Sequence, residues 1–187
     1  MPRLFVAIDL PLDIRERLGA LCCGLPGARW VEPEQMHLTL RFIGDVDGSV
    51  LRPVQEALAE VRAEEFCLQL EGIGFFPPRG SPRVVWVGIR KSEQLLLLRN
   101  RIESVLVRAG LDPEGRKFSP HITLARLKNT PASRIGAYLA QHGLFVTEEF
   151  RVSEFLLYSS VLNDRGARHY IEEGYLLAGG PLEERKI

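Results

Sequence analysis

Two of the four histidines in this chain of 187 residues stand in the same short frame, His37-Leu38-Thr39-Leu40 and His121-Ile122-Thr123-Leu124. In a β-strand, residues i and i+2 face the same side. Each frame would therefore put an imidazole and a hydroxyl on one face and two aliphatic side chains on the other. The repeated frame predicts two strands that each present one His and one Thr to a common cleft.

These groups suit a displacement at phosphorus. Such a reaction requires a base for the attacking oxygen, an acid for the leaving oxygen and donors for the equatorial phosphate oxygens. An imidazole, with an ordinary pKa of about 6.5, can be the base at one position and the acid at the other. The residues alone leave open which histidine has which role. Thr39 and Thr123 supply hydroxyl donors, and the chemistry requires no metal and no cofactor.

Other uses of the reactive residues fit the sequence less well. A zinc site takes three or four clustered ligands, whereas the frames supply two His, so we expect no metal site. Cys22, Cys23 and Cys67 lack metal-ligand spacing and are expected to be reduced, buried thiols. No Gly-x-Ser-x-Gly segment that would indicate a serine nucleophile is present. His142 and His169 are expected to be structural.

Alternating and helical periodicities indicate the elements that position the two frames. We expect strands over residues 1–9, 35–42, 66–70, 84–89, 120–126, 150–160 and 168–177, and helices over residues 11–25, 49–63, 92–109 and 130–143. Ser49 and Ser92 are the expected N-caps. Residues 74–83 form a turn-rich segment, residues 163–166 a turn, and Trp30 and Trp86 are assigned to the core.

The order His-strand, helix, strand, strand occurs twice, over residues 36–89 and 120–177. This pattern predicts a weak internal duplication and an α+β fold with two similar lobes. We treat residues 1–187 as a single bilobal catalytic domain.

Composition limits the function classes. No apolar run approaches the roughly 18 residues that cross a bilayer, and the first residues alternate like a strand, so we expect no membrane segment, no cleaved leader and a cytoplasmic protein. The chain has 24 basic and 24 acidic residues. Zero net charge argues against tight nonspecific binding to a nucleic-acid backbone and favours binding of an end or a few nucleotides. No obligate protein partner is evident.

The segments His37-Leu38-Thr39-Leu40-Arg41-Phe42-Ile43-Gly44 and Ser119-Pro120-His121-Ile122-Thr123-Leu124-Ala125-Arg126 resemble the two signature segments of the two-histidine (2H) phosphoesterase superfamily. Within it, the chain is most similar to bacterial and archaeal RNA 2′,3′-cyclic phosphodiesterases, long known as 2′-5′ RNA ligases. Residues 3–8, 72–77, 86–88 and 158–162 also fall in that family's order, so the resemblance covers nearly the whole chain.

The resemblance implies a bilobal fold, with two antiparallel sheets and outer helices around a central cleft, related by a pseudo-two-fold duplication. It implies hydrolysis of a terminal 2′,3′-cyclic phosphate, on RNA ends or cyclic nucleotides, to a 2′-phosphate. By the same resemblance, His121 activates water, His37 protonates the departing 3′ oxygen, and Thr39 and Thr123 hold phosphate oxygens. Two other activities stay open: 2′-5′ joining of tRNA halves, and a nucleotide-binding module without turnover, although a pure binder needs no paired acid and base.

Two further substrate contacts follow from the resemblance. Arg126 corresponds to a family arginine that neutralises phosphate charge. Strict alternation would turn it away from the His121 face, so this role requires a twist or bulge in the strand. Phe76, or its neighbour Phe75, is expected to stack on the terminal base. Arg41 shares the His37 face by parity and is expected at the cleft rim.

Overall fold

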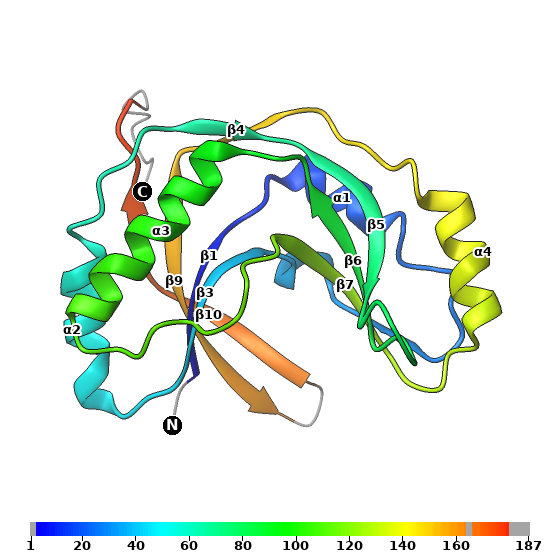
Figure 1. The fold of residues 1–187 in the computed structure, drawn as a ribbon, viewed down its shortest axis with the longest axis horizontal. Coiled ribbons are helices and arrows are strands. Elements are labelled where there is room, and N and C mark those ends of the chain that lie inside the picture. The colour runs from blue at the N-terminus through cyan, green and yellow to red at the C-terminus, as the bar shows by residue number, and fades with distance from the viewer. Residues whose placement is uncertain (1–2, 164–165, 180–187) are drawn as a thin grey trace.

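The strands of the computed structural model, which describes residues 3–163 and 166–179, form two four-stranded sheets and one two-stranded sheet (Figure 1). One sheet has the order β10-β9-β1-β3, with bounds β1 (Arg3–Ile8), β3 (Leu38–Asp45), β9 (Glu154–Asn163) and β10 (Gly166–Leu176). The other has the order β2-β7-β6-β5, with bounds β2 (Ala28–Trp30), β5 (Leu70–Phe76), β6 (Val84–Ile89) and β7 (His121–Leu127). Strands β4 (Phe66–Leu68) and β8 (Phe150–Val152) pair with each other. Every strand pair is antiparallel.

The helices lie on the two sides of the molecule. Helices α2 (Gly48–Leu58) and α3 (Glu93–Arg108) pack together on the side of β3, at the left of Figure 1. Helix α4 (Ala132–His142) packs on β5, and α1 (Leu12–Gly19) lies by the short 3₁₀ helix η1 (Pro33–Gln35). No helix of the described residues is long and apolar enough to cross a bilayer. The expected α+β architecture, with antiparallel sheets and outer helices, is confirmed.

The two lobes do not correspond to the two sequence repeats. Strand β3, from the first repeat, shares its sheet with β9 and β10 from the end of the second. Strand β7, from the second repeat, shares its sheet with β5 and β6 from the first. Each lobe therefore depends on strands from both halves of the chain, and the two motif strands lie in different sheets.

The hydrophobic core anchors both motif strands. Leu38, Leu40, Ile122 and Leu124, which alternate with the motif His and Thr, are at most 2% exposed and join one continuous cluster. Burying such a side chain stabilises the fold by about 1.5–3 kcal/mol. Because a register slip would expose these residues, the core fixes which face carries the His and Thr.

Several expected boundaries are wrong, and among them the second helix ends at Leu58 instead of residue 63. The first helix ends at Gly19 instead of residue 25, because the amides of Leu21 and Cys22 bond to the carbonyls three residues earlier and close the helix with tight turns. Residues 74–76, expected in the turn-rich segment, continue β5. Asp47, not Ser49, caps α2, and its carboxylate accepts a hydrogen bond from the Ser49 amide at 2.8 Å. Ser92 caps α3 as expected.

The cysteines are free, but they are not all buried. Cys22 is half-buried, whereas Cys23 and Cys67 are exposed. Cys67 lies in the outward position of the short strand β4, whose neighbours Phe66 and Leu68 are buried. Residues 164 and 165 of the expected turn lie outside the described residues.

Candidate active site

Both motif strands contain a β-bulge directly after the threonine. In β3, Thr39 pairs with Ala7 but Arg41 pairs with Val6, which leaves Leu40 as the extra residue. In β7, Thr123 pairs with Trp86 but Ala125 pairs with Val85, which leaves Leu124 as the extra residue. A bulge reverses the alternation of faces beyond it. The fifth residue after each histidine is thereby returned to the face of that histidine.

The bulge in β7 brings Arg126 to the cleft face. Leu124 and Ala125 are both buried, and Arg126 is exposed and pairs with Val84, which in turn pairs with Phe76. Directly paired residues share a face, so Arg126 lies on the face that carries Phe76. The role expected for Arg126 requires a twist or bulge in its strand, and β7 contains such a bulge.

The bulge in β3 has the opposite effect on Arg41. Instead of reaching the cleft rim, Arg41 is only 7% exposed and forms ion pairs with Glu103 of α3 at 2.8 Å and with Glu114 at 3.2 Å. Its guanidinium also donates to the carbonyl of Asp112. The expected place of Arg41 was wrong because parity was counted without the bulge. Arg41 instead connects β3 to α3 through Glu103, and to the segment before β7 through Asp112 and Glu114.

The two catalytic candidates are held in the same way. The Nδ1 atom of His37 lies 2.8 Å from the carbonyl oxygen of Gln35, and that of His121 lies 2.7 Å from the carbonyl oxygen of Ser119. A carbonyl only accepts hydrogen bonds, so each Nδ1–H donates. The proton held at Nδ1 leaves each Nε2 free to exchange a proton with a ligand.

The wall around His37 is aromatic. The His37 ring lies 4.8 Å from the ring of Phe5 and meets the ring of His169 edge-on at 5.1 Å, while Tyr158 stacks on Phe5 at 5.1 Å. His169 was expected to be a structural residue, and the sequence did not place it beside His37. His169 lies beside His37 because β10 belongs to the same sheet as β3. No local feature of the sequence indicates that these two strands share a sheet.

Burial controls the charge of His37. Desolvation lowers its pKa to about 4; the hydrogen bond to Gln35 acts in the opposite direction, and the charges of His169, Arg15 and His121 lower the pKa further. Burial also lowers the pKa of His169. In the free protein His37 is therefore neutral at neutral pH, with Nε2 unprotonated.

The wall around His121 is built from β5 and β6. Phe76 meets the His121 ring edge-on at 5.0 Å, and the Trp86 ring lies 5.1 Å from that of Phe76. Trp86 is therefore part of the cleft wall, not of the core. A Cβ atom at Gly74 would lie 2.3 Å from the indole, so glycine is needed there for the ring to lie across β5. Trp30, by contrast, packs against the core.

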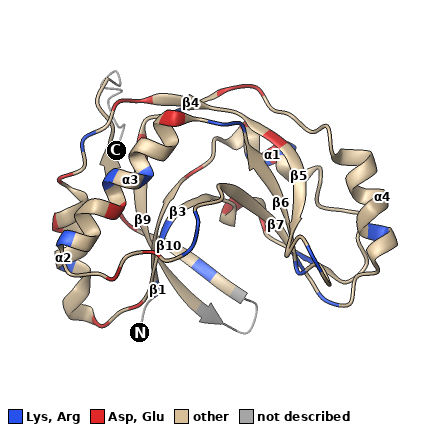
Figure 2. Ribbon diagram, viewed as in Figure 1, with Lys and Arg blue, Asp and Glu red and all other residues tan. Residues whose placement is uncertain are grey.

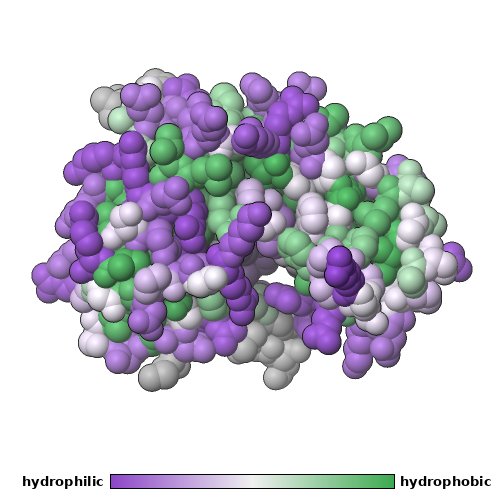
Figure 3. Space-filling view, viewed as in Figure 1, coloured by the Kyte–Doolittle hydropathy of each residue, from purple (hydrophilic) through white to green (hydrophobic). Residues whose placement is uncertain are grey.

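Thr39 and Thr123 remain available for a ligand. Both side chains are partly exposed, and within the described residues neither hydroxyl has a hydrogen-bond partner. A cavity of about 190 Å³ beside His37 is lined by Asp9, Arg15, Glu34, Gln35, Met36, His37, Tyr158, His169 and Ile171. Two larger hollows lie away from these groups, around Arg151 and around Lys91. Figure 3 shows the surface hollowed near its middle, between the left and right halves.

The residues of the structure do not suggest a metal centre. Among residues 3–163 and 166–179, no three His, Cys, Asp or Glu side chains are grouped so that they could hold an ion. The arrangement as a whole offers two Nε2 atoms, two hydroxyl groups and one guanidinium, contributed by two sheets. These groups can move protons and bind an anion.

Comparison with known proteins identifies the family. The family model described as LigT like Phosphoesterase matches residues 8–86 and again residues 87–168, in agreement with the duplication. An Archaeoglobus fulgidus protein named RNA 2′,3′-cyclic phosphodiesterase is 34% identical, over 88% of this chain and 94% of its own. One of the same name from Aeropyrum pernix is 40% identical, over 76% and 82%. The crystal structure of E. coli LigT complexed with 3′-AMP superposes with a TM-score of 0.77 at 30% identity, over 95% and 99% of the two chains. Because the family model covers most of the chain and matches it once around each His-x-Thr frame, the chain belongs to the LigT-like phosphoesterase family of the 2H superfamily.

Proposed function

We propose that this protein is an RNA 2′,3′-cyclic phosphodiesterase that hydrolyses a terminal 2′,3′-cyclic phosphate to a 2′-phosphate. The observation that carries the proposal is the matched pair of imidazoles, each fixed through Nδ1 on a backbone carbonyl and each with Nε2 unused. The names of the relatives support the activity, and the complex of E. coli LigT with 3′-AMP supports a nucleotide phosphate as the ligand.

In this mechanism the two histidines have opposite roles. His121 Nε2 takes a proton from water as the water oxygen bonds to phosphorus. The P–O3′ bond opposite the water breaks, and His37 Nε2–H gives its proton to O3′. The anionic phosphate makes this possible, because an opposite charge within about 4–6 Å raises a histidine pKa by roughly 1–3 and so offsets the burial of His37.

The remaining groups bind the substrate. The Thr39 and Thr123 hydroxyls donate to equatorial phosphate oxygens, and Arg126 neutralises phosphate charge from the cleft face of β7. Phe76 stacks on the terminal base, where its ring already lies against His121. These roles require neither a metal nor a protein partner. We place the reaction in the cytoplasm, where free thiols such as those of Cys22, Cys23 and Cys67 stay reduced.

Hydrolysis of a 2′,3′-cyclic mononucleotide in excess chelator, followed by phosphorus NMR, tests the proposal. The expected product is the 2′-phosphate, formed at the same rate with and without chelator. A 3′-phosphate would reverse the orientation of the substrate, and activity that needs an added divalent ion would overturn the mechanism.

Variants of the two histidines test their roles. His37→Ala and His121→Ala should each lower kcat by about 10²–10⁴ or more, the usual contribution of a positioned acid or base. His142→Ala, at the end of α4, is the matched control and should retain activity. Near-normal turnover by either cleft variant would contradict the assignment.

A further inference from the structure

The backbones of the two motif histidines are held in different ways. His121 is the first residue of β7, and it pairs with Gly88 of β6. His37 lies one residue before β3, and the pairing of β3 with β1 ends at Leu38, opposite Ile8. Strand pairing therefore fixes the backbone of His121 but not that of His37. The imidazole of His37 must be held by contacts outside the strand pairing.

The ring of His37 lies across the face of its sheet. Strands β3 and β10 are the opposite edges of this sheet, whose order is β10-β9-β1-β3. The ring centroid of His37 is nevertheless close to rings on each of the other three strands: 4.8 Å from Phe5 of β1, 6.0 Å from Tyr158 of β9 and 5.1 Å from His169 of β10. The segment that leads into β3 therefore brings His37 to the opposite edge of the sheet.

Gln35 connects this segment to β10. The backbone amide of His169 donates a hydrogen bond to Oε1 of Gln35 at 2.9 Å, although the two residues are 134 positions apart in the chain. The backbone carbonyl of Gln35 accepts the hydrogen bond from Nδ1 of His37 at 2.8 Å. One residue thus binds both the edge strand β10 and the imidazole.

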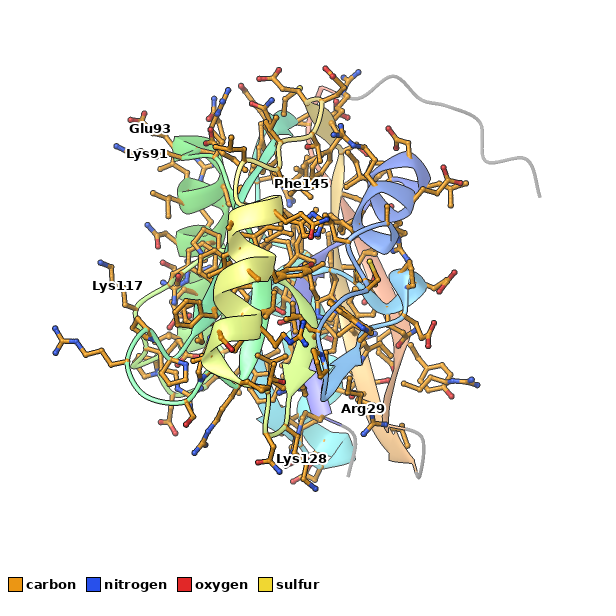
Figure 4. All side chains as sticks on the ribbon, turned by 90° about the vertical axis from the view of Figure 1, so that its right-hand side faces the viewer. Arg29, Lys91, Glu93, Lys117, Lys128 and Phe145 are labelled. Atoms are coloured by element: carbon orange, nitrogen blue, oxygen red, sulfur yellow. The ribbon has the colours of Figure 1, made fainter. Side chains whose placement is uncertain are left out.

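The remainder of η1 is held by α1 and by the core. The guanidinium of Arg15 in α1 donates to the carbonyl of Pro33, the first residue of η1, at 3.3 Å. Met36, which follows Gln35, is 1% exposed and belongs to the core. In Figure 4, α1, η1 and β10 lie along the same, right-hand side of the molecule. The side chain of Gln35 is the contact that joins this segment to β10.

Loss of that contact would change the surroundings of His37. The ring of His169 lies against His37, and within the described residues the buried Nδ1 of His169 has no hydrogen-bond partner. Figure 2 shows an acidic residue at η1, near the middle of the molecule. The other titratable groups around the imidazole are Asp9, Arg15, Glu34, Tyr158 and His121, and Arg15 is bound to Asp9. If β10 moved away, water and the carboxylates would both favour a protonated imidazole.

We propose that Gln35 is a positioning residue for His37: its side chain binds the edge of β10, so that its carbonyl and the His169 ring hold the imidazole in place for the proton transfer. This inference rests on the proposed function, because it assumes that His37 is the acid. The corresponding residue before His121 is Ser119, which is exposed and whose side chain has no hydrogen-bond partner in the described part of the chain. Such a contact is needed only at His37, because strand pairing already holds His121.

The variant Gln35→Met tests the contact without any measurement of activity. It retains a side chain of similar length but removes the acceptor of the His169 amide. In hydrogen exchange followed by NMR, the His169 amide should exchange faster in the variant than in the wild-type protein. The pKa of His37, about 4 in the folded protein, should rise toward its ordinary value because water reaches the ring. An unchanged exchange rate or an unchanged His37 pKa would overturn the inference.

Steady-state kinetics with a 2′,3′-cyclic mononucleotide test the consequence for the reaction. Gln35→Met should lower kcat by up to about 100-fold, the cost of displacing a reacting group by roughly 1 Å. KM should stay nearly constant, because the variant leaves Thr39, Thr123 and Arg126 in place. A normal kcat, or a change confined to KM, would contradict a positioning role.

Gln69→Met is the matched control. The side chain of Gln69 also bonds to a distant backbone group, the carbonyl of Thr147, at 2.7 Å and across 78 positions in the chain. Gln69 lines the hollow around Lys91 and Glu93, which lie at the opposite, upper left edge of Figure 4. In urea unfolding this variant should lose about as much stability as Gln35→Met, but its kcat and its His37 pKa should be those of the wild-type protein. Equal changes of kcat and His37 pKa in both variants would overturn the inference.

A second variant, His169→Ala, keeps the backbone amide that Gln35 binds but removes the ring beside His37. It should also raise the pKa of His37. Combined with Gln35→Met, its effect on kcat should be less than additive, because both changes act on one imidazole. Full additivity would mean independent effects and would overturn the inference. If the wild-type protein hydrolyses no 2′,3′-cyclic nucleotide, the proposed function fails, whereas amide exchange and the His37 pKa still decide whether Gln35 positions this ring.

Discussion

The burial of His37 predicts a measurable pH dependence of stability. In the folded protein the pKa of His37 is about 4, compared with an ordinary value of 6.5. Between these two pH values the unfolded chain binds a proton at this residue and the folded chain does not. The stability that depends on a neutral His37 is therefore complete above pH 6.5 and is lost as the pH falls to about 4.

The magnitude follows from the difference between the two pKa values. One pH unit corresponds to about 1.4 kcal/mol, so the interval from 6.5 to about 4 corresponds to about 3 kcal/mol. Replacement of His37 by Gln, which cannot titrate, removes this contribution. On going from about pH 7.5 to about pH 4, the wild-type protein should lose about 3 kcal/mol more unfolding free energy than His37→Gln does.

Urea unfolding of both proteins at the two pH values gives this difference, and an NMR titration of the His37 ring measures the pKa directly. His142→Gln is the control: it shows how much the loss of a histidine outside the site changes the pH dependence of the unfolding free energy. The same pH dependence in His37→Gln as in the wild-type protein, or a His37 ring that titrates at its ordinary value, would refute the view that burial keeps this imidazole neutral.

Three other predictions concern the same groups. Because the bound phosphate raises the pKa of His37, the alkaline limb of kcat should lie roughly 1–3 pH units above that of kcat/KM in pH–rate profiles, and coincident limbs would count against His37 as the acid. Arg41→Met should lower the unfolding free energy in urea by about 1–3 kcal/mol, because Glu103 then keeps only its ion pair with Arg99 and Glu114 loses its partner Arg41, whereas no measurable loss would show that the cluster is not structural. Gly74→Ala should lower stability by about 1–3 kcal/mol and shift tryptophan fluorescence by displacing Trp86. Gly115→Ala, where a Cβ meets nothing within 4 Å, is its control, and equal effects of the two would refute the packing argument.

The sequence predicted the parts of the site that depend on local pattern. Alternation placed Leu38 and Ile122 in the core and the motif His and Thr on the other face, because a period of two residues is a property of the strand itself. The tetrapeptide frame pointed to His37 and His121 as the catalytic candidates without any knowledge of the fold. The helix capped by Ser92 was found for the same reason, since a cap is a contact between residues three apart.

What the sequence could not predict depends on strand pairing. His169 lies beside His37 because β10 joins the sheet of β3. Arg41 turns inward because one extra residue in β3 has no partner in β1. Trp86 lies in the cleft because Gly74 on the neighbouring strand makes room for its ring. Each of these facts concerns residues far apart in the chain, and no local period encodes them.

The bulges also predict a chemical difference between two nearly equivalent frames. By themselves, His37 with Thr39 and His121 with Thr123 are related by the duplication, and either imidazole could protonate either ribose oxygen. Because each strand bulges after its threonine, the fifth residue after each histidine returns to the face of that histidine, and there the frames differ: β3 has Phe42, which is 46% exposed, whereas β7 has Arg126. An apolar ring at one position and a guanidinium at the other make the two walls chemically distinct. We therefore expect anionic substrate groups to be drawn toward the wall of His121, and the residues that follow the bulges, not the symmetric histidines, to set the substrate orientation.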